Sequence, residues 1–146
     1  YTFIKLTVPP PSMIIFDASN RDQCEVKRTN TNTPLQALVM MNDPTVLEAS
    51  RVLAQRLLKE NISPEQRITK AFRSIVCRTP KAEEQKILDT YFANQLAQFR
   101  NKTLDAPKTL KVGEFPDDKE EDVNEKAALM KTVSAIYNLE EAITKS

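Results

Sequence analysis

Three aspartates near the N-terminal part of the chain are the residues best suited to acid–base chemistry. Asp17, Asp22 and Asp43 lie around a polar run from Arg28 to Pro44. Two carboxylates at a suitable separation can cleave a glycosidic bond, one as the acid and the other as the base or nucleophile. Aspartates in such positions also cap helices and form surface ion pairs. We favour capping and ion pairing, and the catalytic alternative stays open because proximity in sequence does not establish the required separation.

Other catalytic and cofactor chemistries lack the residues that they need. The sequence contains no histidine, which excludes histidine-based triads and histidine metal sites within this chain. Two cysteines do not form a CxxCH haem-attachment motif, and one glycine cannot build a GxGxxG or P-loop. The acidic run at 117–122 lacks the glycine and the ligand spacing of a calcium loop. We therefore expect no cofactor and no metal in this chain.

The polar run contains two helix starts in succession. Thr33 lies three residues before Gln36, which is the spacing of a capping box, and Pro34 suits the first helical position between them. Asp43 and Pro44 repeat the combination of N-cap and helix-starting proline. The sequence therefore predicts a short helix, a sharp corner and a longer helix.

Apolar residues at helical spacing continue along the rest of the chain. The helix from Pro44 ends by Asn61, and we expect its charged and amide side chains to face outward: Glu48, Arg51, Gln55, Arg56 and Lys59. Ser63 and Gln66 form another capping box before the next helix. Four sets of mostly apolar residues each fall on one helix face: Val46, Leu47, Ser50, Leu53, Ala54, Leu57 and Leu58; Ile68, Ala71, Phe72, Ile75 and Val76; Ile87, Leu88, Tyr91, Phe92, Leu96 and Phe99; and Leu129, Met130, Val133, Ile136 and Tyr137.

The segments outside these stripes are less regular. Pro9, Pro10 and Pro11 favour an extended conformation, and the apolar run at 12–16 should lie against the core. In the long connection at 101–122 we expect Leu110, Val112 and Phe115 to anchor the chain, Gly113 to adopt an unusual φ, and the acidic run at 117–122 to be solvated. Cys77 should be a small buried apolar residue, and pairing of Cys24 with Cys77 stays open.

Composition and pattern together predict one all-α domain over residues 1–146. It has four to five main helices, a proline-rich N-terminal arm and one long acidic connection. A total of 21 Lys and Arg against 20 Asp and Glu gives a net charge of +1, which argues against a nucleic-acid partner. No apolar run approaches the roughly 18–20 residues of a membrane span.

Several runs of this sequence resemble a bacterial C-terminal domain of unknown function (domain of unknown function 1553). The runs are FDASNRDQC at 16–24, KR at 27–28, TNTPLQALVMMNDP at 31–44, LKVGEFP at 110–116 and AALMKTVSAIYNLEEAITK at 127–145. Leu129 replaces the tryptophan usual in that domain, and Glu140 replaces an aspartate; both changes are compatible with helix packing. The resemblance brings no activity with it.

The resemblance implies a context for the chain. The domain occurs in large proteins, many of them planctomycete, that often carry a cytochrome-c-like domain. We therefore expect the C-terminal part of a longer, exported multidomain protein, periplasmic or extracellular. The expected function is a non-catalytic structural or interaction domain whose partners are upstream domains of the same parent. The alternative is one wall of an interdomain active site in a polysaccharide-acting or redox enzyme.

Five polar residues in and beside the polar run exceed what the helix caps require. They are Arg21, Arg28, Asn30, Asn32 and Asn42. Fork-shaped arginines beside amides suit recognition of carboxylates and backbone carbonyls. The sequence thus makes these residues candidates for an interface, with internal ion pairing of the two arginines as the alternative.

Overall fold

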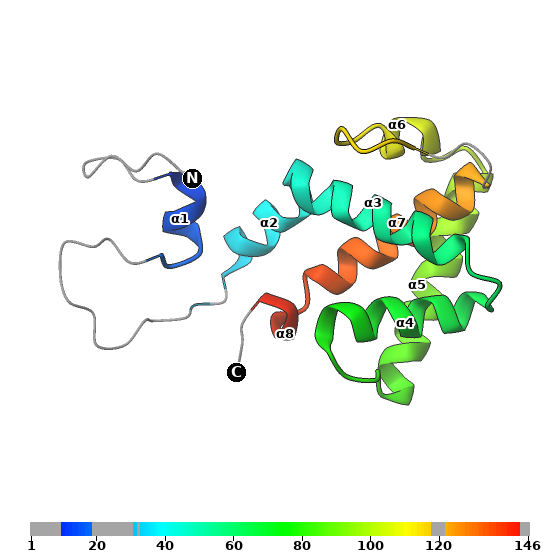
Figure 1. Cartoon of the computed structure of the whole chain (residues 1–146), viewed down its shortest axis with the longest axis horizontal. Coiled ribbons are helices and arrows are strands. Elements are labelled where there is room, and N and C mark those ends of the chain that lie inside the picture. Colours follow the sequence, from blue (N-terminus) through cyan, green and yellow to red (C-terminus); the bar gives the residue numbers. More distant parts are fainter. Residues whose placement is uncertain (1–9, 19–30, 32, 118–121, 144–146) are drawn as a thin grey trace. The chain divides into compact units, whose positions relative to one another are not determined.

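A computed structural model of the chain describes residues 10–18, 31, 33–117 and 122–143. Within these residues it contains helices and no strand, which confirms the all-α prediction. The helices are α1 (Pro11–Ile15), α2 (Pro34–Asn42), α3 (Pro44–Leu58), α4 (Pro64–Val76), α5 (Ala82–Arg100), α6 (Ala106–Leu110), α7 (Val123–Tyr137) and α8 (Glu140–Ile143) (Figure 1). The five helices α2, α3, α4, α5 and α7 are the main ones, as predicted.

The chain divides into two compact units, residues 1–39 and residues 40–146. In the first unit, α1 begins at Pro11, so this proline does not continue an extended segment as the sequence predicted. Its fixed φ suits the first turn of a helix, and Met13 N donates to Pro10 O at 2.9 Å. Ile14 is 59% exposed and Phe16 is also exposed, so the prediction that residues 12–16 are buried is wrong for these two side chains.

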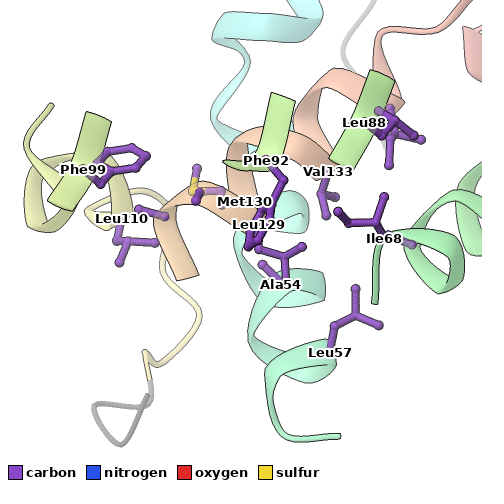
Figure 2. Packing of buried hydrophobic residues seen from close by; sticks show 14 of the residues in the cluster. Ala54, Leu57, Ile68, Leu88, Phe92, Phe99, Leu110, Leu129, Met130 and Val133 are labelled. Atoms are coloured by element: carbon purple, nitrogen blue, oxygen red, sulfur yellow. The ribbon is translucent and has the colours of Figure 1, made fainter. Parts of the chain in front are cut away.

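The second unit is organised around α7. This helix lies between α3 and α4 and also packs against α5 and α6 (Figure 1). Leu129, Met130 and Val133 of α7 meet apolar side chains of the surrounding helices (Figure 2). The small residues Ala127 and Ala128 are fully buried, which is consistent with close approach of the neighbouring backbones. Leu129, which replaces the tryptophan usual in the domain that the sequence resembles, is 1% exposed and belongs to this core.

The predicted stripes identify the correct helices, but not every side chain in them is buried. Ile87 is 67% exposed, although its spacing placed it on the buried face of α5. Cys77 is also exposed, because it forms the C-cap of α4 in a left-handed conformation with φ 62° and does not continue the helical face. Cys24, whose pairing with Cys77 the sequence leaves open, lies outside the described residues.

The long connection contains a helix that the sequence analysis missed. Asp105 caps α6 by accepting from Lys108 N at 3.0 Å, and Pro107 suits its first turn. Leu110 is buried, as expected of an anchor, but the side chain of Phe115 is 52% exposed. The loop that carries Phe115 is held through its backbone.

Candidate functional site

Four of the five predicted interface residues lie outside the described residues: Arg21, Arg28, Asn30 and Asn32. Asn42 is described, and it is the exposed last residue of α2 in the second unit. The interface therefore stays a prediction. The structure does describe residues on both sides of the segment that carries Arg21, Arg28 and Asn30.

Hydrogen bonds join the two sides of this segment. The Asp17 carboxylate accepts from Thr31 N at 2.8 Å and from Thr31 Oγ1 at 2.5 Å. Gln36 Nε2 donates to Ile15 O at 2.8 Å and to Thr31 Oγ1 at 3.3 Å. Residues before and after the segment 19–30 therefore belong to one small hydrogen-bond network.

Gln36 is the centre of this network and is only 1% exposed. Its Oε1 accepts from Thr33 N at 3.0 Å, and its backbone N–H donates to Thr33 Oγ1 at 3.3 Å, so the two residues form a capping box. Its amide nitrogen is then available for Ile15 and Thr31. One side chain thus caps α2 and also fastens the end of α1.

Asp17 has a left-handed backbone conformation and a carboxyl group whose pKa is lowered. Its φ is 52°, a left-handed conformation that aspartate tolerates better than most residues. The hydrogen bonds from the side chain and then the backbone of Thr31 lower the pKa of the Asp17 carboxyl. Asp43 caps α3 by accepting from Thr45 N at 2.8 Å and Val46 N at 3.2 Å. Both described aspartates of the catalytic alternative therefore accept backbone hydrogen bonds, and Asp22 lies outside the described residues.

Arg51 of α3 contradicts the predicted outward face. It is 1% exposed and Gln55 is 4% exposed, whereas both were expected to point to solvent. Arg51 Nε donates to Val112 O at 3.1 Å, and Nη2 donates to Phe115 O at 2.6 Å. The reason for burial is that the connection after α6 crosses this face of α3 and supplies carbonyl acceptors for the guanidinium.

Glu48 and Gly113 also hold this loop against α3. Glu48 Oε1 accepts from Phe115 N at 2.5 Å and lies 3.8 Å from Arg51 Nη2. Gly113 has φ 77°, as the sequence predicted, and a β-carbon there would lie 2.1 Å from Glu48 Cδ. Glycine is therefore needed both for the backbone conformation and for the approach of Glu48.

Lys126 of α7 is a second buried cation at the same loop. It is 1% exposed, and its Nζ donates to Asp117 Oδ1 at 2.7 Å. The same oxygen lies 3.7 Å from Arg51 Nη1. Asp117 is exposed, as expected, with 41% of its side chain accessible, and its Oδ1 also pairs with these two cations, which would otherwise be costly to bury.

Spacing contained a signal for both buried cations. Arg51 follows Leu47 by four residues and precedes Ala54 by three, and Lys126 precedes Leu129 by three. These steps place both residues on the apolar faces of their helices. Their residue types predicted exposure instead, because Arg and Lys are almost never fully buried unless they are paired.

A further charged cluster joins α4, α5 and α8. Arg78 donates to both oxygens of Glu84 at 2.7 and 2.8 Å and to both oxygens of Glu141 at 2.7 and 3.1 Å, and it lies 4.9 Å from the Phe72 ring centroid. The bonds to Glu84 and then Glu141 raise the pKa of Arg78. The bond from Arg78, with a second from Lys81 N, lowers the pKa of Glu84 to about 2. Each charged side chain of this cluster hydrogen-bonds to an oppositely charged one, which is typical of ion pairs that stabilise the packing of helices.

The described residues contain no group of three or more histidine, cysteine, aspartate or glutamate side chains placed to hold a metal ion. None of the described helices is both long and apolar enough to span a bilayer.

Comparison with known proteins identifies a family without an assigned activity. The model of the family described as PSD1, "Protein of unknown function (DUF1553)", matches residues 1–92. The match includes the polar run and helices α1 to α4, whereas the LKVGEFP run and α7 lie beyond it. No curated protein and no solved structure matches the chain.

Proposed function

The chain belongs to the PSD1 family of proteins of unknown function (DUF1553), and we propose that it is a non-catalytic interaction domain that docks onto the rest of a larger exported protein. In this proposal the partners are upstream domains of the same parent, located in the periplasm or outside the cell. The proposed docking residues are the segment 19–30 and Asn32, all in the first unit; Asn42, in the second unit, stays a separate candidate.

The observation that carries the proposal is the network of Asp17, Thr31 and Gln36. It joins the two ends of a segment that contains Arg21, Arg28 and Asn30. Fixing both ends of a segment reduces the conformational entropy that binding must remove.

The residue types of this segment suit a protein partner. Arginine presents five N–H donors in a planar fork, which matches carboxylates and backbone carbonyls. Asn30 and Asn32 add side chains that both donate and accept hydrogen bonds. A neighbouring domain of the same protein offers such acceptors at a high effective concentration.

The alternative, one wall of an interdomain active site in a polysaccharide-acting or redox enzyme, has less support. It needs carboxylates whose oxygens can act on a substrate. Asp17 and Asp43 instead accept short hydrogen bonds from nearby backbone N–H groups. These bonds favour the interaction function.

The experiment is an association measurement between this chain and the separately expressed remainder of its parent. An Arg21→Ala, Arg28→Ala double variant should weaken binding by about tenfold or more, since each charged hydrogen bond contributes about 1.5–3 kcal/mol. The control is an Arg56→Ala, Arg73→Ala double variant, which removes two exposed arginines of the second unit. It should bind like wild type.

Two outcomes would contradict the proposal. One is equal binding by the Arg21→Ala, Arg28→Ala variant and wild type, which would place the interface elsewhere. The other is a collapse of the melting temperature of that variant, which would show that the two arginines pair internally and hold the fold together.

A further inference from the structure

A hollow of about 600 Å³ lies beside the buried guanidinium of Arg51. All of its lining residues belong to the second unit, whereas the segment 19–30 belongs to the first. Its size falls within the range of small-molecule sites. Its lining consists of Arg51, Pro107, Leu110, Lys111, Val112, Gly113, Phe115, Asp117 and Val123.

One nitrogen of Arg51 is buried without a hydrogen bond to any described residue. Nε and Nη2 donate to carbonyls of the loop, but Nη1 has no hydrogen-bond partner among the residues that the structure describes. Asp117 Oδ1, a carboxylate oxygen, is 3.7 Å from Nη1, which is too long for a hydrogen bond. Since nearly all buried donors in proteins are satisfied, an orphaned guanidinium nitrogen beside a hollow calls for an acceptor.

The surroundings restrict the chemistry of that acceptor. Arg51, Lys111 and Lys126 supply three positive charges here, and Glu48 and Asp117 supply two negative charges. One negative charge on a ligand therefore balances the site, and a second would be in excess. Apolar side chains form much of the remaining wall, including Pro107, Leu110 and Val123. A singly charged carboxylate with a short apolar body fits both conditions.

We propose that this hollow binds a monocarboxylate whose oxygen accepts a hydrogen bond from Arg51 Nη1, with its apolar part against Leu110 and Val123. Lys111, which is exposed and lines the hollow, adds a positive charge at the mouth. Asp117 competes with the ligand for the guanidinium. Because its side chain is 41% exposed, Asp117 can turn toward water if the ligand carboxylate takes its place between Arg51 Nη1 and Lys126 Nζ, so that neither buried cation is left without an anion.

The test compares butyrate with butyramide, its uncharged analogue, by titration calorimetry and by amide chemical shifts of residues 110–117. Butyrate should bind saturably and butyramide should not. Asp117→Asn should tighten butyrate binding by about threefold or more, because asparagine still accepts from Lys126 but no longer competes as an anion. Lys111→Ala should weaken binding without changing the melting temperature.

Two further probes define the ligand class and its source. N-acetylleucine represents the carboxylate at a peptide end, and tighter binding of it than of butyrate would identify a peptide as the source. Tighter binding of butyrate would identify a small molecule. Inorganic phosphate binding more tightly than either would overturn the carboxylate assignment, and equal effects of butyrate and butyramide, or no tightening in Asp117→Asn, would overturn the site.

Discussion

Replacing Arg51 by lysine tests how the connection after α6 is held. The change keeps the positive charge and much of the aliphatic stem, but it removes the planar fork. In the protein, Nε and Nη2 donate to Val112 O and Phe115 O from a side chain that is 1% exposed. An ammonium at the end of a flexible stem cannot reproduce both bonds in this geometry.

The expected cost follows from these two bonds. A hydrogen bond to a charged group contributes about 1.5–3 kcal/mol, and an abandoned buried acceptor adds a desolvation cost. If lysine keeps one bond, Arg51→Lys should lower the free energy of unfolding by about 2–4 kcal/mol. For a chain of this length that corresponds to a fall in Tm of roughly 5–15 °C.

The assay is urea denaturation followed by circular dichroism at 222 nm. Arg56→Lys is the matched control, because Arg56 lies on the same helix but is exposed; it should stay within about 0.5 kcal/mol of wild type. Equal midpoints for Arg51→Lys and Arg56→Lys would refute the claim that the buried fork of Arg51 holds the loop.

Four other changes should alter stability in urea. Gly113→Ala should destabilise by at least about 1–2 kcal/mol, because φ is 77° and a β-carbon would meet Glu48; an unchanged midpoint would contradict this. Cys77→Gly should stabilise by about 0.5–1 kcal/mol, since φ at this C-cap is 62°, whereas Cys77→Ala should bring no such gain. Thr33→Ala should cost about 0.5–2 kcal/mol through loss of the cap, so a variant as stable as wild type would argue against that role. The lowered pKa of Glu84 contributes stability that is complete above the ordinary value of 4.5 and is lost as pH falls toward about 2; Glu84→Gln should flatten this dependence, and an equally steep profile would contradict it.

Local signals predicted most of the helical framework. Helix starts at Pro34, Pro44 and Pro64 are visible in the sequence because capping residues and proline act within one turn. The apolar stripes predicted α3, α4, α5 and α7 because each of these helices buries a face in the core. The short α6 was missed because Asp105 and Pro107 lie in a segment without a sustained stripe.

The tertiary role of charged residues could not be predicted in the same way. Arg51 and Lys126 are buried because the loop at 111–117, distant in sequence from α3, brings carbonyls and Asp117 to them. That loop has no periodicity from which its path could be inferred. For Gln36, the cap was predictable from Thr33, but its second bond to Ile15 depends on a contact across 21 residues.

The measurement that most directly tests the central claim is amide hydrogen exchange of this chain, alone and with the remainder of its parent. Docking through the segment between Asp17 and Thr31 predicts slower exchange concentrated at residues 19–32, with α5 unchanged. Protection confined to α5, or no change anywhere at saturating partner, would contradict the assignment of this chain as an interaction domain that uses that segment.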